Sequence, residues 1–144
     1  MPALRHLSHD ADKVAEALPG LLEEHGLAGA PCVLWGRSIG ATCAIHLAAK
    51  HGEHFKGCVI ESGLMEIKSL PMVMQMSFML PGGPALLQNL PDPLGTLGKL
   101  GEVTIPLLVI HGDHDEIVPV SQGQQCHDVE RPLLPQHVCL DLPV

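Results

Sequence analysis

Aromatic residues and clusters of positive charge are both scarce in this 144-residue chain. It has no Tyr, one Trp and two Phe, and its 8 Lys and Arg residues are outnumbered by 16 Asp and Glu, for a net charge of −8. Proteins that bind nucleic acid rely on basic patches to neutralise phosphates and on aromatic platforms to stack single-stranded bases. We therefore expect no nucleic-acid partner.

Long apolar runs are also absent, since none reaches the roughly 18 residues that a membrane span needs. Residues 1–13 are polar and rich in His, without the apolar core of a secretory signal. The 5 Cys form no C-x-x-C pair, and three fall in apolar runs, which is typical of buried thiols in a reducing compartment. These features predict a cytoplasmic protein with no membrane span in this chain.

The chain instead alternates short apolar runs with stretches of helical periodicity, and 46% of its residues are hydrophobic. This alternation predicts a parallel α/β sheet with right-handed crossovers. We expect strands that are covered by helices on both faces, because their residues are apolar throughout. The expected strands are 32–35, 56–62 and 106–111, with 138–142 able to form a fourth, and the expected helices are 8–26, starting at a Ser8 cap and kinked or divided at Pro19, 39–50 and 120–129.

A nucleophile motif lies at the first strand-to-helix junction. Gly36, Ser38 and Gly40 form the pattern G-x-S-x-G between the apolar run and a helix of small residues. In such a turn the serine adopts a strained backbone and projects its hydroxyl clear of the sheet, and glycine at both flanking positions avoids clashes with strand and helix. The start of the helix and the Ile39 N–H would then face an oxyanion on the substrate. The alternative is a glycine-rich turn in which Ser38 only caps the helix.

A second motif, HGDHDEIVP, follows the third apolar run at residues 111–119. Together with the G-x-S-x-G turn, in this order and spacing, it resembles the α/β-hydrolase superfamily, in particular its serine-aminopeptidase-like and lipase-like branch. The resemblance covers about residues 8–125. It implies a partial α/β-hydrolase fold, with three or four mostly parallel strands and flanking helices, in a single domain over residues 1–144.

The resemblance also implies a chemistry and its residues. Ser38 matches the nucleophile of ester or amide hydrolysis through an acyl-serine intermediate, Ile39 supplies an oxyanion-hole N–H, and Asp115 matches the acid that orients the base. Asp113 is a neighbouring rival for the acid, and Glu61 is a further candidate because some relatives place theirs after the preceding strand. The implied partner is a small-molecule or lipid-like acyl substrate.

The sequence departs from the family in two ways. The family's first strands, with the loop that gives a second oxyanion N–H, would precede Met1, and no His occupies the place of the catalytic His after the last strand. His137 and His127 are the candidate bases, although a structural or solvated His is the better explanation for each. We therefore expect a serine hydrolase by descent that is incomplete or inactive as this chain. A non-catalytic remnant or protein-interaction module of the same fold is the alternative.

The cluster of His111, Asp113, His114 and Asp115 gives a minor alternative, a metal-dependent hydrolase. Its spacing matches neither H-x-H-x-D-H nor H-E-x-x-H, and no distant His/Asp pair completes such a site. We expect neither a metal nor a cofactor.

Two further expectations follow from the order of the segments. Residues 64–101, which hold five of the 6 Met, lie where the family inserts a lid, although an ordinary helix packed on the core explains the Met residues equally well. Without earlier strands beside it, the run 32–35 becomes an apolar open edge of the sheet. Such an edge favours self-association through strand pairing.

Overall fold

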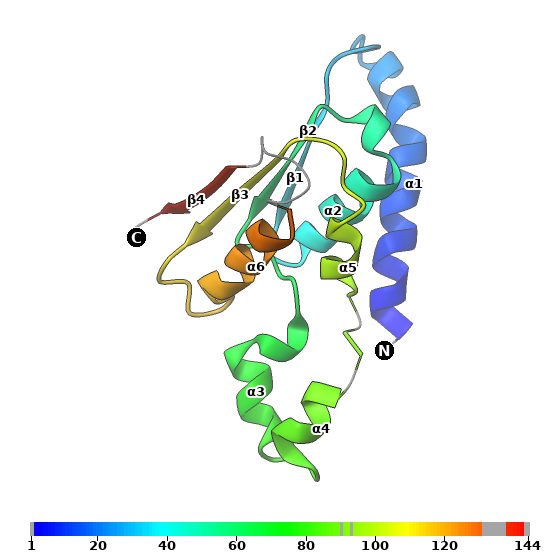
Figure 1. Ribbon diagram of the computed structural model, residues 1–144. Coiled ribbons are helices and arrows are strands. Elements are labelled where there is room, and N and C mark those ends of the chain that lie inside the picture. The colour runs from blue at the N-terminus through cyan, green and yellow to red at the C-terminus, as the bar shows by residue number, and fades with distance from the viewer. Residues whose placement is uncertain (1, 90, 93, 131–137, 143–144) are drawn as a thin grey trace.

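The core of the fold is a sheet of four parallel strands (Figure 1). The computed structural model describes residues 2–89, 91–92, 94–130 and 138–142. The strands pair side by side in the order of the sequence: β1 (Val33–Arg37), β2 (Gly57–Glu61), β3 (Leu107–Gly112) and β4 (Val138–Leu142). The predicted parallel α/β architecture with three or four strands is confirmed, and 138–142 forms the fourth strand.

Helices connect and precede the strands. They are α1 (Pro2–Glu24), α2 (Gly40–Lys50), α3 (Pro71–Ser77), α4 (Gly83–Asn89), α5 (Thr96–Leu100) and α6 (Val120–Glu130), with the 3-10 turns η1 (Gly52–His54) and η2 (Ile67–Ser69). Apart from α1, the predicted elements begin and end within two residues of the observed ones. No helix in the described part of the chain combines the length and the apolar character that a membrane crossing requires.

Helix α1 differs from its prediction at both points that the sequence raised. It begins at Pro2 rather than at Ser8, because proline fits the first turn of a helix, where its missing N–H would have no partner. Ser8 is therefore not a cap, and its hydroxyl accepts a hydrogen bond from Lys99 Nζ at 3.1 Å. Pro19 lies inside α1 without dividing it, since one lost backbone hydrogen bond near the end of a long helix does not end it.

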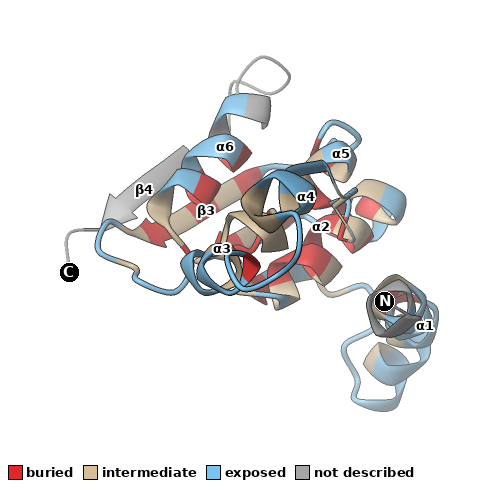
Figure 2. Ribbon diagram, turned by 90° about the horizontal axis from the view of Figure 1, so that it is seen from below, coloured by how far each residue is buried: buried red, intermediate tan, exposed pale blue. Residues whose placement is uncertain are grey.

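The helices cover one face of the sheet. Strands that follow one another in a parallel sheet are joined by right-handed crossovers, which place every connecting helix on the same side. Burial along the strands agrees, since Ile60, Leu107 and Val109 are at most 2% exposed. Opposite them, Ala41 and Ile45 of α2 are fully buried, because small side chains let the helix approach the sheet closely. Figure 2 shows the buried residues gathered where α2 and α6 meet the strands.

The other face of the sheet carries apolar side chains that no described helix covers. Alternate residues of β1 point there, and Val33 and Trp35 are 59% and 68% exposed. On β3 the alternate residues Leu108 and Ile110 are half-buried. The prediction that helices cover the strands on both faces is therefore wrong for the described residues, because their connections all cross on one side.

The segment between β2 and β3 has two parts: an arm, formed by α3 and α4, and helix α5, which belongs to the body of the sheet and its covering helices. Helices α3 and α4 project away from the sheet, as Figure 1 shows, and Met72, Phe78 and Met79 are 67%, 72% and 89% exposed. Helix α5 returns to the body and packs on α2, with Thr96 and Leu100 fully buried. The Met residues of the arm are therefore not explained by packing on the core.

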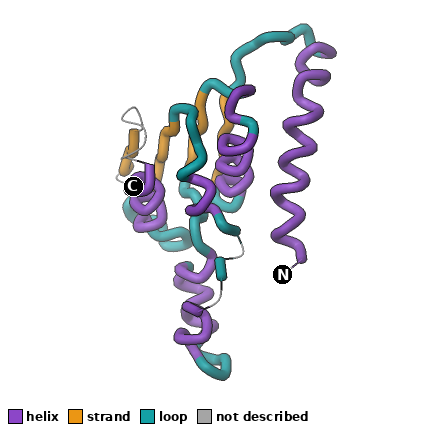
Figure 3. Tube along the Cα trace, turned by 45° about the vertical axis from the view of Figure 1, so that its right-hand side comes forward, coloured by secondary structure: helices purple, strands orange, loops and turns teal. Residues whose placement is uncertain are grey.

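A single carboxylate joins α1 to α2. Asp12 accepts hydrogen bonds from His46 Nε2 at 2.8 Å, His51 Nε2 at 3.1 Å and Lys50 Nζ at 2.7 Å. Although burial opposes ionisation, the hydrogen bond from Lys50 above all holds the pKa of Asp12 far below its usual value. This network holds α1, the outermost helix in Figures 1 and 3, against α2.

His111 of β3 is buried against α6. Its side chain is wholly inaccessible, Nε2 donates to Val118 O at 2.8 Å, and Nδ1 has no partner among the described residues. The ring fits because α6 has glycine opposite it, since a Cβ on Gly123 would lie 2.7 Å from Nδ1. A contact this close leaves no room for a methyl group.

We predict that Gly123→Ala destabilises the protein by about 1–3 kcal/mol, because the new methyl group overpacks the His111 ring. The matched control is Gly98→Ala in α5, where a Cβ would meet no atom within 4 Å. That change should stabilise the protein by up to about 1 kcal/mol through helix propensity. Urea unfolding of the purified chain measures both, and equal effects of the two changes would contradict the packing argument.

Candidate active site

The site is assembled at the carboxyl ends of three neighbouring strands, where parallel strands bring their following loops together. The backbone links the three loops directly. Ser38 N, after β1, donates to Glu61 O at 3.0 Å, and Ser62 N, after β2, donates to Ile110 O of β3 at 2.9 Å. The two sequence motifs begin at Gly36 and His111, and these hydrogen bonds place both on one edge of the sheet.

Ser38 has the backbone that a nucleophile turn requires. Its φ is +52°, in the left-handed region that non-glycine residues seldom occupy. Gly36 explains how the chain turns here, because a Cβ at that position would lie 2.6 Å from Gly40 O and 2.7 Å from Ala44 Cβ. At Gly40 itself a Cβ would meet nothing within 4 Å. The expected clash is therefore confirmed at Gly36, whereas at Gly40 a single Cβ meets no neighbour and the clash expected of bulky side chains stays a prediction.

The turn is fixed by its own backbone and leaves one N–H without a partner. Ser38 O accepts from Ala41 N and from Leu64 N, both at 3.1 Å, so the residue is tied to α2 and to the loop after β2. Within the described part of the chain, the Ile39 N–H has no acceptor. It lies at the start of α2, where the helix dipole favours negative charge. This is the geometry expected of an oxyanion-hole donor.

Asp115 is held as an ionised carboxylate. Burial disfavours its charge, but hydrogen bonds from the Val118 and Ile117 N–H groups, both at 2.9 Å, and from the Ser62 hydroxyl lower its pKa below the usual value, with a smaller effect from His111. Both N–H groups bind Oδ1. The second carboxylate oxygen, Oδ2, therefore has capacity to accept from an imidazole N–H.

Two residues that the sequence did not single out support this arrangement. Ser62 repeats the geometry of Ser38 one strand further on, with φ +44°, and its hydroxyl contacts Asp115. Gln122 of α6 is 1% exposed, and its Oε1 accepts from Met65 N at 2.7 Å and Glu66 N at 3.0 Å. A serine directly after a buried strand is a signal that could have indicated Ser62, whereas nothing in the helix sequence marks Gln122.

The rival acids have other surroundings. Glu61 lies at the end of β2, where its carboxylate accepts from Trp35 Nε1 at 3.1 Å and pairs with Arg37 Nε at 3.5 Å. Asp113 pairs with the exposed imidazole of His114 at 2.7 Å. Asp115, by contrast, accepts hydrogen bonds from two backbone N–H groups of its own loop, which fix the orientation of its carboxylate.

The general base is the part of the site that the described side chains do not supply. His137 lies outside the described residues, and His127 lies on α6 with a side chain that is likewise outside them. His111 is near Asp115, with Nε2 and Oδ2 3.9 Å apart, but it is buried and bonded to Val118 O. Among the described side chains, none accepts a hydrogen bond from the Ser38 hydroxyl.

A cavity of about 290 Å³ opens beside Asp115 and is lined by Glu61, Ser62, His111 and His114 among others. Ser38 does not line it. The residues of the 111–115 cluster do not converge as three metal ligands in the described structure. The cavity therefore lies next to Asp115 rather than at Ser38.

We predict that Gly36→Ala destabilises the protein by about 1–3 kcal/mol, because its Cβ would press on the backbone and side chains of α2. Gly40→Ala, two residues beyond Ser38, is the matched control and should change stability by less than about 0.5 kcal/mol. Thermal unfolding of the two variants measures the difference, and a Gly36→Ala protein as stable as the wild type would refute the close approach of β1 and α2.

Comparisons with known proteins agree with this geometry. A family model described as the prolyl oligopeptidase family matches residues 8–129. No functionally curated protein matches the sequence. The structure resembles an acylaminoacyl peptidase of Pyrococcus horikoshii, at a TM-score of 0.69 and 18% identity, over 99% of this chain and 24% of that one.

Two smaller hydrolases share the fold. A monoacylglycerol lipase of Paleococcus ferrophilus has a TM-score of 0.60 and 13% identity, over 92% of this chain and 65% of that one. An esterase of Pyrococcus furiosus has a TM-score of 0.65 and 16% identity, over 88% and 50%. The chain thus spans between 24% and 65% of the length of these three structures.

The superfamily expected from the two motifs is therefore confirmed, whereas the matching family model is not the serine-aminopeptidase-like branch named from the sequence. The match extends over both motifs and from within α1 to within α6. This protein belongs to the prolyl oligopeptidase family of the α/β-hydrolase superfamily.

Proposed function

We propose that this chain carries the nucleophile, the acid and one oxyanion donor of a serine hydrolase that cleaves esters or amides through an acyl-Ser38 intermediate. The observation that carries the proposal is the left-handed backbone of Ser38 at a strand-to-helix turn, since strain of this kind at a non-glycine residue is characteristic of functional sites. Membership of a serine hydrolase family supports it.

The proposed reaction begins when a base removes the proton from Ser38 Oγ, which then attacks the substrate carbonyl. The carbonyl oxygen becomes an oxyanion and accepts from the Ile39 N–H. Asp115 orients the protonated imidazole, which gives its proton to the leaving group. Water then attacks the carbonyl carbon of acyl-Ser38 and gives a proton to the imidazole. The imidazole returns that proton to Ser38 Oγ as the acid product leaves.

The substrate class is proposed from the neighbours and from the arm. The similar structures include peptidases, a lipase and an esterase, all of which cleave an acyl bond. The arm of α3 and α4, together with the turn between them, exposes flexible thioethers and a phenyl ring, which adapt to varied apolar groups. We propose a small-molecule or lipid-like acyl substrate, with the arm, part of the lid-like segment 64–101, contacting its apolar portion.

A fluorophosphonate probe tests the nucleophile, because it reacts with activated serines. Although the sequence predicts an inactive chain, activity under this proposal requires that the probe labels Ser38 in the purified chain and leaves Ser38→Ala unlabelled. The control is Ser121→Ala, which removes an exposed serine of α6 and should retain labelling at Ser38. Peptide mass spectrometry locates the adduct, and its absence from Ser38 would reject the proposal.

The same assay distinguishes the candidate bases. His127→Gln or His137→Gln should reduce the labelling rate by about 100-fold or more if that imidazole is the base. The competing function is a non-catalytic module of the same fold, which the lack of a described base beside Ser38 favours. Under that function, p-nitrophenyl ester hydrolysis by the chain equals that of Ser38→Ala.

We also propose that the chain self-associates through β1 and the bare face of the sheet, which is the face that no described helix covers. Among the described strands, β1 has a neighbour on one side only, and its Val33 and Trp35 are exposed. An apolar, unpaired strand edge is a template for a second chain. Val33→Lys should lower the average mass measured by light scattering after size exclusion.

The matched control for this change is Leu27→Lys, which adds the same charge at a 52% exposed apolar position outside the sheet. It should leave the association unchanged. A wild-type chain that remains monomeric at high micromolar concentration would contradict this proposal without affecting the labelling of Ser38.

A further inference from the structure

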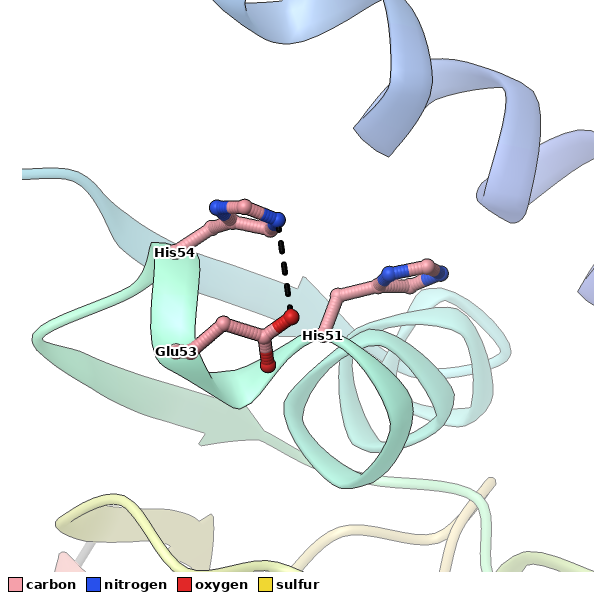
Figure 4. Close-up of side chains that lie close together, drawn as sticks. All are labelled: His51, Glu53 and His54. Carbon is pink, nitrogen blue, oxygen red and sulfur yellow. Dashed lines mark ion pairs between the residues drawn. The ribbon is translucent and has the colours of Figure 1, made fainter.

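A cluster of metal-ligand side chains lies at the far end of α2 from Ser38. His51 directly follows α2, and Glu53 and His54 belong to the 3-10 turn η1. One ligand atom from each of the three lies within 4.8 Å of the other two. Figure 4 shows the carboxylate of Glu53 placed between the two imidazole rings. No other group of three such side chains comes together in the described residues.

The distances between these atoms are close to those between the ligand atoms of a bound metal ion. Zinc–ligand bonds of about 2.0–2.2 Å in a tetrahedron place neighbouring ligand atoms about 3.4 Å apart. His54 Nε2 and Glu53 Oε1 are 3.5 Å apart, so this pair already has the required separation. The two imidazole rings are roughly parallel, with centroids 6.4 Å apart. Both Glu53 and His54 are more than half exposed, so their side chains are free to rotate inward.

Asp12 fixes the ring of His51 in the form that a metal needs. A carboxylate can only accept hydrogen bonds, so the His51 Nε2 that faces Asp12 Oδ1 at 3.1 Å must carry the proton. In the neutral ring the lone pair is then on Nδ1, while the Nε2 end is directed toward α1 (Figure 4). A carboxylate that orients a metal-binding imidazole through its second nitrogen is the usual outer partner of such sites.

The local charges also favour a cation. The carbonyl groups at the C-terminal end of α2 carry partial negative charge, and Glu53 adds a full one. The nearby ammonium group of Lys50 is bound to Asp12 at 2.7 Å. Two imidazoles and one carboxylate suit Zn²⁺ and related ions, whereas Mg²⁺ and Ca²⁺ prefer oxygen ligands alone.

We propose that His51, Glu53 and His54 bind a divalent transition metal ion of the zinc class, with Asp12 as the positioning residue for His51. The site is independent of the hydrolase proposal, because the 11 residues of α2 separate it from Ser38 by about 16 Å. Three protein ligands leave a fourth position for water. Binding links the end of α2, the turn η1 and, through Asp12, helix α1.

Titration with Co²⁺ tests the site, because its visible absorption reports tetrahedral ligation by nitrogen and oxygen. We expect one equivalent to bind, Zn²⁺ to displace it, and the double variant Glu53→Gln/His54→Gln to lose the signal. Both replaced side chains are exposed, so the fold should persist, which far-UV circular dichroism checks. Asp12→Asn should weaken binding about 10- to 100-fold.

The matched control is Asp113→Asn/His114→Gln, which removes another exposed imidazole–carboxylate pair that lies outside the cluster. It should leave Co²⁺ binding unchanged, and Zn²⁺ should raise the melting temperature of this variant and of the wild type but not of Glu53→Gln/His54→Gln. The proposal is overturned if the cluster variant binds as tightly as the wild type, or if the bound cobalt shows the near-ultraviolet absorption of thiolate ligands.

Discussion

The close contact between β1 and α2 at Gly36 is the constraint on which the rest of the structure depends. Because only a hydrogen atom fits there, the chain reverses direction within a few residues, and Ser38 takes the left-handed conformation. The same contact places α2 against β1 and β2, where its small residues are buried. Helix α1 then lies against α2 through Asp12, so the outer layer is positioned by the inner one.

The order of the strands explains why the site and the bare face occur together. Consecutive parallel strands place all loops after the strands on one edge, which brings Ser38, Ser62 and Asp115 into one region. The same order places all connecting helices on one face. A sheet of this kind can bring the residues of a site together on its own loops while its other face stays uncovered by the described helices, as the exposure of Trp35 shows.

The features that the sequence could predict are those set by neighbouring residues. The strands are continuous apolar runs, and Gly36 marks the turn at Ser38, so both were predictable. The hydrogen bonds of Asp12 and Gln122 could not be predicted. Their partners lie 34 to 57 residues away in the sequence and come into contact only after the helices pack. The roles of Ser38 and Asp115 remain predictions, although their loops share one edge of the sheet. Neither the sequence nor the structure identifies the base, since His137 lies outside the described residues.

The arm has both of its roots tied to the body. Gln122 binds the backbone at Met65 and Glu66 where the segment leaves, and Thr96 Oγ donates to Thr42 Oγ at 3.2 Å where it returns. With the ends fixed, a longer tip costs only about 0.6 kcal/mol of closure entropy for each doubling of its length. Evolution can therefore lengthen, shorten or exchange the tip with little effect on the stability of the sheet, which makes this segment the natural place for related chains to diverge in what they recognise.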